Sequence, residues 1–388
     1  MEKFAFLQDQ LDALKAADLL RTLRCIRSAA GPTVMVDGDS RARVNFCSNN
    51  YLNIASDPHV IQAVSQAARR WGYGASASRL ICGTMDPHVE LEERFAAFAG
   101  KEASVMFPSG WMANEAVLRT IPQKGDLVLM DKADHASIID AAKAGEATFR
   151  TWRRDNPDRL RKLLAGGDYR RRFIVTESVF SMDGDTADLE LLVELKNAYG
   201  AILIVDEAHS AGCMGPTGAG FAEERGLPAQ VDIMIAPLGK AFGAAGAMVA
   251  AGRTVADYLI NRARAFIYTT APAPVNCAAV MAALDIIRSE PQRRRMLADN
   301  AAYLRNRLAD SGLDIANSCS HIIPVVIGSS KDALAASEAL YEKGFLLPAI
   351  RPPTVPAGSA RLRISVQSRH TQEQMDALVD TLQDVVGH

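Results

Sequence analysis

Short apolar runs alternate with longer amphipathic segments over residues 103–251 of this 388-residue chain. The runs are largely apolar, and residues 201–205 are continuously apolar, which is typical of a strand buried on both faces of a sheet. Strands that alternate with helices favour a mostly parallel sheet covered by helices, so we expect an α/β fold. The predicted strands are residues 103–107, 127–130, 172–176, 201–205, 233–236 and 247–251.

The N-terminal region has a different pattern. Leu7, Leu11 and Leu14 recur at helical spacing and predict an amphipathic helix over residues 2–24. Residues 33–45, with a polar turn in the middle, predict a short hairpin. Further helices are expected from Asp57-Pro58 onward and over residues 88–99.

The C-terminal region predicts a long helical tract over residues 275–308, followed by shorter elements. Strands at 321–327 and 360–366 flank a helix at 331–342, and a final amphipathic helix ends the chain. We therefore expect three parts. They are an N-terminal helix and hairpin (1–44), a large domain (45–285) and a smaller α+β C-terminal domain (286–388).

Charge and cysteine usage exclude several classes of protein. The chain has 43 Lys and Arg against 45 Asp and Glu, so its net charge of -2 gives no electrostatic basis for binding nucleic acid or an acidic membrane. Six scattered cysteines without a C-x-x-C pair argue against a zinc site or a disulfide framework. No apolar run reaches the length of a membrane span, and acidic residues interrupt the N-terminal segment. We expect a cytoplasmic protein without a metal site and without nucleic-acid or membrane partners.

The predicted strand 201–205 is followed at once by Asp206-Glu207-Ala208-His209, where ligands bind in α/β sheets. The tetrad spells the acidic box of a helicase-type ATPase, but Gly239-Lys240 and Gly100-Lys101 both lack the rest of the phosphate-binding motif. A metal pair of Asp206 and His209 is a second interpretation, without a further ligand cluster. The third is a pyridoxal 5'-phosphate (PLP) site, where a strand-end carboxylate pairs with the pyridinium nitrogen and a later lysine forms the Schiff base. Asp206 and Lys240 fit these two roles.

Two segments offer further contacts for such a cofactor. Residues 107–114 join a strand end, a small turn and a helical run, which supplies N–H donors for a phosphate. Trp111 either packs near the cofactor ring or is a core tryptophan, and His135 is either structural or stacks on the ring. Lys240 lies among small and apolar residues, where burial makes an amine a usable nucleophile, although an exposed turn lysine is the alternative.

Taken in order, eight stretches of the chain resemble the α-oxoamine synthases, a family of PLP-dependent enzymes. The resemblance covers nearly the whole chain and implies PLP-dependent transferase fold type I, with a large domain around a mostly parallel sheet and a smaller C-terminal domain. It also implies PLP as cofactor and a homodimer with shared active sites. The stretches are residues 45–52 (NFCSNNYL), 109–114 (SGWMAN), 134–137 (DHAS), 176–185 (TESVFSMDGD), 205–209 (VDEAH), 238–243 (LGKAFG), 349–356 (AIRPPTVP) and 361–363 (RLR).

The resemblance further implies roles for single residues. Lys240 would be the Schiff-base lysine and Asp206 the partner of the pyridinium nitrogen, while His135 would stack on the ring and assist protonation. Arg363 would hold the carboxylate of the amino-acid substrate. The other implied contacts are Gly110, Trp111, Ser181 and His209 with PLP, Thr269 and Thr270 with the PLP of the other subunit, and Arg21 and Thr354 with the acyl substrate.

The implied activity is the decarboxylating condensation of a small amino acid with an acyl thioester. Residues 351–356 favour L-alanine and a pimeloyl thioester of coenzyme A or acyl carrier protein, giving 8-amino-7-oxononanoate for biotin synthesis. Related enzymes that use glycine or serine, such as glycine C-acetyltransferase and serine palmitoyltransferase, stay open as alternatives. So does a non-catalytic binding protein of this fold, although the presence of both Lys240 and Asp206 argues against it.

The chain departs from the family pattern at three places. Pro237, three residues before the lysine, replaces a Thr or Ser that usually donates to the phosphate, and proline has neither hydroxyl nor N–H. Asn53 replaces a common glycine, and residues 74–78 contain alanines in a loop that is usually richer in glycine and serine. These changes bear on the identity of the substrate more than on that of the cofactor.

Overall fold

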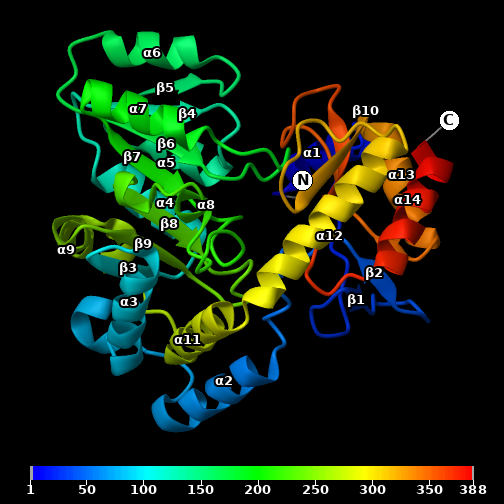
Figure 1. The fold of residues 1–388 in the computed structure, drawn as a ribbon, viewed down its shortest axis with the longest axis horizontal. Helices are drawn as coiled ribbons and strands as arrows, with labels where there is room; N and C mark the ends of the chain where they lie inside the picture. The colour runs from blue at the N-terminus through cyan, green and yellow to red at the C-terminus, as the bar shows by residue number, and fades with distance from the viewer. Residues whose placement is uncertain (1–2, 387–388) are drawn as a thin grey trace. The chain divides into compact units, whose positions relative to one another are not determined.

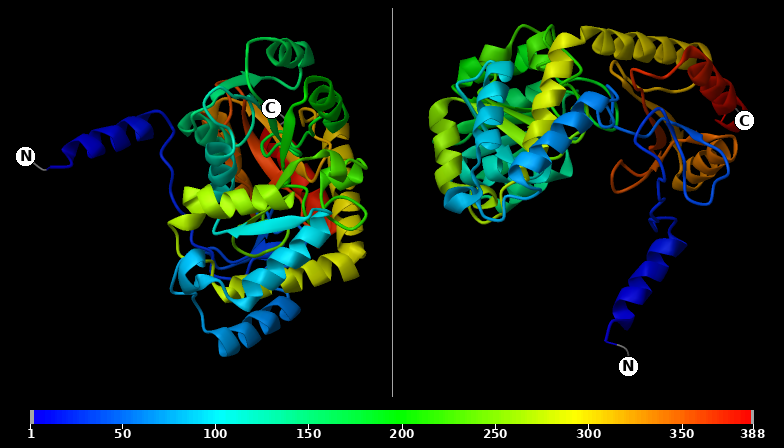
Figure 2. Two further views of the ribbon diagram at one scale, coloured as in Figure 1. Left: turned by 90° about the vertical axis from the view of Figure 1, so that its left-hand side faces the viewer. Right: turned by 90° about the horizontal axis from the view of Figure 1, so that it is seen from below.

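The computed structural model describes residues 3–386 (Figures 1 and 2). The chain forms two compact units. Unit 1 combines residues 1–49, 182–184 and 296–388, and unit 2 combines residues 50–181 and 185–295. The N-terminal segment thus belongs to the same unit as the C-terminal part, and one boundary falls inside helix α12 (Pro291–Asp310). The predicted division at 44/45 and 285/286 stays a prediction.

Unit 2 is built around a sheet that has seven strands within the described chain, in the order β3-β9-β8-β7-β6-β4-β5. Strands β8, β7, β6, β4 and β5 are parallel, and β9 runs antiparallel to both β3 and β8. The predicted mostly parallel sheet is confirmed. The strands are β3 (Ala103–Phe107), β4 (Leu127–Asp131), β5 (Thr148–Trp152), β6 (Arg172–Glu177), β7 (Ile202–Asp206), β8 (Ile233–Pro237) and β9 (Ala247–Ala251).

Helices cover both faces of this sheet, which explains why its strands are largely apolar (Figure 1). Successive side chains point to opposite faces, so Val128 and Leu129 of β4 join different apolar layers. One layer contains α4 (Gly110–Thr120), α5 (Ala136–Ala144), α9 (Arg253–Arg262) and α10 (Arg264–Ile267). The other contains α6 (Pro157–Ala165), α7 (Leu189–Tyr199) and α8 (Phe221–Glu224).

The remaining helical elements of unit 2 follow their sequence signals closely. Asp57 caps α2 by accepting the N–H of His59 at 3.0 Å, and Pro58 occupies the first helical position. The helical tract predicted over 275–308 is confirmed, but it consists of two helices, because Pro291 cannot continue a helix and starts a new one after Glu290. The elements are α2 (Pro58–Trp71), η1 (Arg79–Gly83), α3 (Asp86–Ala99), η2 (Pro228–Gln230) and α11 (Pro274–Ser289).

Unit 1 contains two small sheets. The predicted hairpin is confirmed as β1 (Thr33–Val34) and β2 (Arg43–Asn45), with β11 (Phe345–Leu346) parallel to β2. In the second sheet, β13 (Ala360–Ser365) lies between β10 (Ile322–Gly328) and β12 (Ala349–Ile350), all antiparallel. Helices α13 (Ser330–Glu342) and α14 (Gln372–Val386) match their predictions, whereas the two-residue strands β11 and β12 were not predicted.

The N-terminal helix α1 (Ala5–Ala16) is shorter than predicted. Its carboxyl end is followed by Asp18 with a φ of +56°, a conformation that cannot continue a right-handed helix, and Glu2 lies outside the described residues. Leu7, Leu11 and Leu14 are each more than two-fifths exposed, and α1 buries none of its residues. Figure 2 shows α1 standing away from the other elements of unit 1.

Over residues 3–386, none of the helices combines the length and the apolar character that crossing a membrane requires.

Candidate active site

Lys240 lies in the tight loop that follows the carboxyl end of β8. The N–H of Gly243 donates to the Lys240 carbonyl at 2.9 Å, and Gly243 has a φ of +62°. A Cβ at position 243 would lie 2.4 Å from the backbone nitrogen of Ala55, so the loop requires glycine. The Lys240 side chain is partly buried, and its Nζ lies 2.9 Å from Nε2 of His209. The alternative of an exposed turn lysine is therefore wrong.

Asp206 is the last residue of β7 and is buried. Its Oδ2 accepts a hydrogen bond from Nδ2 of Asn114 at 3.0 Å, and its Oδ1 accepts the N–H of Ala208 at 2.9 Å. Both bonds favour a charged carboxylate. No Lys, Arg or His among residues 3–386 forms an ion pair with it, so this buried acceptor suits the N–H of a cationic ring.

His135 precedes α5 and caps it, because its Nδ1 accepts the N–H of Ser137 at 3.2 Å. The Ser137 hydroxyl lies 2.8 Å from the same Nδ1 and accepts from Nδ2 of Asn114 at 2.9 Å, which links His135 to Asp206. Desolvation lowers the pKa of His135; Asp206 opposes this effect and Lys240 adds to it. Its imidazole is therefore neutral at neutral pH, with an exposed ring beside Asp206 and Lys240.

His209 connects Lys240 to Tyr51. The Tyr51 hydroxyl lies 2.7 Å from Nδ1 of His209, and Nε2 faces the lysine amine. Tyr51 and His209 are both buried. Both ring nitrogens of His209 are thus engaged, which is inconsistent with the metal pair of Asp206 and His209. Across residues 3–386, no group of His, Cys, Asp and Glu side chains is arranged to hold a metal.

The predicted phosphate contact lies at the start of α4, and its role toward PLP stays a prediction. Ser109 caps the helix by accepting the N–H of Met112 at 3.2 Å, and Gly110 and Trp111 form its first turn. A Cβ at position 110 would lie 2.9 Å from Cγ of Pro237, so the glycine lets the end of β8 approach the helix closely. Trp111 is 49% exposed, so it is not a core tryptophan. Helix N-termini of this kind bind phosphate groups.

Replacing Pro237 by threonine should strengthen PLP binding. Pro237 ends β8 against Gly110 and offers neither a hydroxyl nor an N–H, whereas threonine offers both. One added hydrogen bond to a charged phosphate corresponds to about 1.5–3 kcal/mol, or roughly a tenfold or greater decrease in Kd. Equilibrium dialysis of PLP measures this, with Pro237→Ala as the matched control that adds no hydroxyl. Unchanged or weaker binding by the threonine variant would contradict the prediction.

The other predicted PLP contacts of unit 2 lie on two loops. Ser181 is buried in the loop after β6. Thr269 is partly buried and Thr270 is exposed, and Thr270 forms an isolated antiparallel bridge with Ser78. The roles of Ser181, Thr269 and Thr270 toward PLP stay predictions.

The three predicted substrate residues all belong to unit 1. Arg363, on β13, is buried, and one guanidinium nitrogen donates to the Ser365 hydroxyl at 2.7 Å. Arg21 and Thr354 line one cavity of about 270 Å³. The structure thus brings together two residues that are 333 positions apart in the chain (354 minus 21), and their substrate roles stay predictions. The other residues that line this cavity are Leu19, Ala349, Ile350, Arg351 and Pro352.

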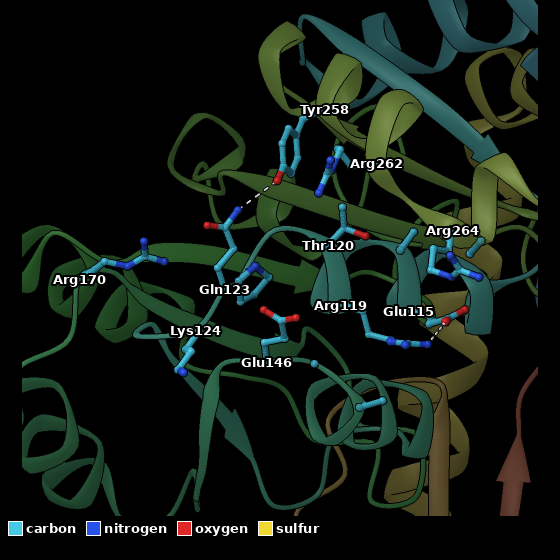
Figure 3. Close-up of a pocket in the computed structure, with 15 residues that line it drawn as sticks. Glu115, Arg119, Thr120, Gln123, Lys124, Glu146, Arg170, Tyr258, Arg262 and Arg264 are labelled. Carbon is cyan, nitrogen blue, oxygen red and sulfur yellow. Dashed lines mark hydrogen bonds and ion pairs between the residues drawn. The ribbon is translucent and has the colours of Figure 1, made fainter.

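A larger cavity in unit 2, of about 660 Å³, contains none of the predicted site residues (Figure 3). It lies at the carboxyl end of α4, opposite the end that carries Gly110. Its wall includes an ion pair between Arg119 and Glu115 at 2.6 Å, together with Arg262 and Arg264 of α9 and α10. Cavity size alone does not identify the active site of this protein.

Comparison with known proteins identifies the family. Residues 41–382 match the family model for class I and II aminotransferases. The 8-amino-7-oxononanoate synthase of Anaeromyxobacter dehalogenans is 45% identical over 377 residues, which are 97% of this chain and 94% of that protein. The chain belongs to the α-oxoamine synthase family. The predicted class of this α-oxoamine synthase, a PLP-dependent C-acyltransferase, is thereby confirmed.

Solved structures agree with the α-oxoamine synthase assignment. A serine palmitoyltransferase from S. paucimobilis with bound PLP–myriocin has a TM-score of 0.92 and 28% identity, covering 99% of this chain and 97% of that chain. The 8-amino-7-oxononanoate synthase of Francisella tularensis has a TM-score of 0.78 and 30% identity, covering 89% and 98%. Fold type I and PLP as cofactor are confirmed.

The residues of this α-oxoamine synthase fit PLP. Asp206 offers a buried acceptor for the ring nitrogen, Lys240 an amine for covalent attachment, and the start of α4 a turn closed by Gly110 for the phosphate. The sequence assigned no role to Asn114 or Tyr51, although both lie in the motifs that carry the family resemblance. Asn114 orients Asp206, and Tyr51 orients His209.

Proposed function

We propose that this α-oxoamine synthase condenses L-alanine with a pimeloyl thioester and releases carbon dioxide, giving 8-amino-7-oxononanoate for biotin synthesis. The observation that carries the proposal is the similarity along almost the whole chain to proteins named 8-amino-7-oxononanoate synthase, at 39–45% identity. Serine palmitoyltransferase is the second candidate, because its TM-score of 0.92 exceeds the 0.78 of the solved 8-amino-7-oxononanoate synthase. Its identity of 28% is much lower than 45%, which favours the first candidate.

Bound PLP supplies an electron sink for a carbanion at the α-carbon of an amino acid. Lys240 would hold the cofactor, and its amine, when free, would take the α-proton. His209, fixed by Tyr51, lies 2.9 Å from the Lys240 amine and keeps it in place. Asp206 would keep a proton on the ring nitrogen, and the neutral His135 would offer a flat surface to the ring.

In the overall reaction, the α-carbon of alanine bonds to the thioester carbonyl carbon. The C–S bond breaks and the thiol leaves, and the carboxyl carbon of alanine leaves as carbon dioxide. The donor thiol is coenzyme A or an acyl carrier protein. Arg21 and Thr354, which line one cavity of unit 1, are proposed to contact the acyl chain. L-Alanine labelled with ¹³C at its carboxyl carbon tests this scheme. The label should appear in carbon dioxide only when both the pimeloyl thioester and the enzyme are present, and label retained in the condensed product would contradict the scheme.

Replacing Arg363 by alanine should weaken amino-acid binding. A guanidinium that holds a carboxylate contributes about 1.5–3 kcal/mol through charge-assisted bonds, so KM for alanine should rise roughly 10- to 200-fold. Arg361, two residues earlier on β13 and paired with Asp183, provides the matched control Arg361→Ala. Steady-state kinetics and the visible spectrum measure the result. A variant Arg363→Ala with unchanged KM would contradict the carboxylate role.

The protein is also proposed to be a cytoplasmic homodimer. Two loops of unit 2, residues 72–79 and 268–271, pair through the Ser78–Thr270 bridge and a 2.9 Å hydrogen bond from the Ala271 N–H to the Ala77 carbonyl. Around this pairing, large apolar side chains are exposed, Tyr73 at 81%, Ile81 at 80% and Tyr268 at 71%. Exposed apolar patches of this kind support an interface with a second copy, in which Thr269 and Thr270 reach the other PLP.

Replacing Ile81 by glutamate should therefore weaken dimerisation. Burying an unpaired carboxylate costs about 3 kcal/mol or more, so the dissociation constant should rise at least about 100-fold. Ile61, which is 53% exposed on α2, provides the control Ile61→Glu. Light scattering coupled to size-exclusion chromatography measures the mass over a dilution series. An Ile81→Glu protein that stays dimeric at the same dilutions as wild type would contradict the proposed interface.

A further inference from the structure

Glu177 is a buried acid at the active site that has no role so far. It is the last residue of β6, and its backbone pairs in parallel register with Asp206, the last residue of β7. Paired residues of neighbouring parallel strands lie about 4.8 Å apart and point to the same face of the sheet. The Glu177 and Asp206 carboxyl groups therefore lie side by side. Only 1% of Glu177 and 3% of Asp206 is exposed.

The two carboxyl groups differ in how their oxygens are satisfied. Asp206 accepts two hydrogen bonds, from Asn114 and Ala208. Within the described chain, Oε2 of Glu177 has no hydrogen-bond partner, and the favourable polar contact of this carboxyl group is with the backbone N–H of His135. A buried charged oxygen without a donor is strongly unfavourable, whereas a protonated carboxyl removes that charge.

The charges around Glu177 also favour a protonated Glu177 beside a charged Asp206. Acidic groups face it from β7 (Asp206) and from the loop after β4 (Asp134), and Asp134 accepts the Glu177 N–H at 2.9 Å. The cations near it are Lys240, whose amine lies beside His209, and Arg154, which pairs with Asp185 at 2.5 Å and with Asp131 at 3.5 Å. His135, at the start of α5, is neutral. Desolvation and then the charge of Asp206 raise the pKa of Glu177 to about 8.

We propose that Glu177 is a positioning residue that keeps a proton on its carboxyl group at neutral pH, so that Asp206 is the charged carboxylate of this pair. This inference rests on the proposed function, because Asp206 and His135 matter through their contacts with PLP. A neutral Glu177 can accept the backbone N–H of His135 without placing a second negative charge beside Asp206. Above about pH 8 Glu177 loses its proton, and the new charge changes the field at the cofactor ring and at Lys240.

Infrared difference spectroscopy of the PLP-loaded enzyme detects the proton directly. The wild-type spectrum minus that of Glu177→Gln should contain the C=O band of a protonated carboxyl at neutral pH, and this band should disappear as the pH rises through about 8. In parallel, the visible band of bound PLP should change with pH through about 8 in wild type, and Glu177→Gln should lack this change. Because glutamine matches the neutral form, its PLP Kd at neutral pH should stay within about threefold of wild type.

Glu207→Gln is the matched control. Glu207 is also a fully buried glutamate at a strand end, but its carboxyl group accepts the N–H groups of Phe221 and Ala222, each at 2.9 Å. Its replacement should leave the alkaline change of the visible band in place. Absence of the protonated-carboxyl band at neutral pH, or an unaltered alkaline change in Glu177→Gln, would overturn the proposal. Burial also raises the pKa of Glu207 and of Asp134, so if Glu177→Gln does not fold, wild type is compared with Glu207→Gln and Asp134→Asn. A band lost through about pH 8 that both variants retain supports the proposal, and its absence from wild type overturns it.

The same samples separate this inference from the proposed function. Borohydride reduction and peptide mapping show whether PLP is attached to Lys240, independently of the state of Glu177. Attachment elsewhere would contradict the roles assigned to the site, whereas attachment at Lys240 without a carboxyl band overturns only the inference about Glu177.

Discussion

Replacing Lys240 by alanine abolishes both covalent PLP attachment and turnover. In the proposed function this side chain is the anchor of the cofactor and the base that takes the α-proton, and within residues 3–386 its amine is the one that lies beside Nε2 of His209. General-base removal alone lowers a rate by about 10²–10⁴-fold, so the loss should exceed about 10³-fold when the anchor is lost too. The visible absorption band of lysine-bound PLP should be absent, and added PLP should not restore it.

Lys101 provides a control within the same chain. Burial lowers the pKa of Lys101, but its amine donates to the backbone carbonyls of Pro228, at 2.7 Å, and Val231. After borohydride reduction of the wild-type enzyme, the pyridoxyl group should be found on the peptide that contains Lys240 and not on the one that contains Lys101. A Lys240→Ala protein with full turnover would contradict the assignment. A wild-type chain that yields no pyridoxyl-lysine would favour a non-catalytic binding protein.

Replacing Asp206 by asparagine has the second largest expected effect. The substitution keeps the shape of the side chain but removes the charge that holds a proton on the ring nitrogen. Removing one partner of a buried charge pair costs about 3–5 kcal/mol, which corresponds to a decrease in turnover of roughly 10²- to 10⁴-fold. The PLP Kd should rise as well. Steady-state kinetics at saturating PLP separate the loss of turnover from the loss of cofactor.

Asp232→Asn is the control for Asp206→Asn. Asp232 lies just before the amino end of β8, whereas Asp206 lies at the carboxyl end of β7. It accepts hydrogen bonds from the Lys196 amine at 2.8 Å and from the Leu203 N–H at 2.7 Å. Its replacement should leave turnover within about twofold, because Asp232 lies before the amino end of β8, whereas Lys240 follows the carboxyl end. An Asp206→Asn enzyme that retains more than about a tenth of wild-type turnover at saturating PLP would contradict the role of Asp206.

The sequence predicted the sheet well because its inner strands are covered on both faces and are therefore largely apolar. Strand β5 was missed for the opposite reason, since it lies at an edge of the sheet and exposes Arg150 and Thr151. The apolar spacing of α11 continues into α12, so the sequence pattern predicted one helical tract without a break. The break occurs at Glu290, and Pro291 in the sequence is the signal for it. Helix α1 has the predicted apolar face, but propensity alone did not show where it ends.

The candidate site was predicted less completely than the fold. Asp206 and Lys240 each follow a strand, so the rule that ligands bind at the carboxyl ends of strands brings them together. The residues that orient them leave no local signal, because Asn114 is 92 positions from Asp206 and Tyr51 is 158 positions from His209. The raised pKa of Glu177 is likewise invisible in sequence, since it depends on burial and on the neighbouring strand.

The most direct test of the proposed function is a comparison of kcat/KM across substrates, measured by thiol release. L-Alanine, glycine and L-serine are each combined with acetyl, pimeloyl and palmitoyl thioesters of coenzyme A, and with pimeloyl acyl carrier protein. We expect L-alanine with a pimeloyl thioester to exceed every other pair by at least about tenfold, or about 1.4 kcal/mol in the barrier. A higher value for glycine with the acetyl thioester, or for L-serine with the palmitoyl thioester, would contradict a role in 8-amino-7-oxononanoate synthesis.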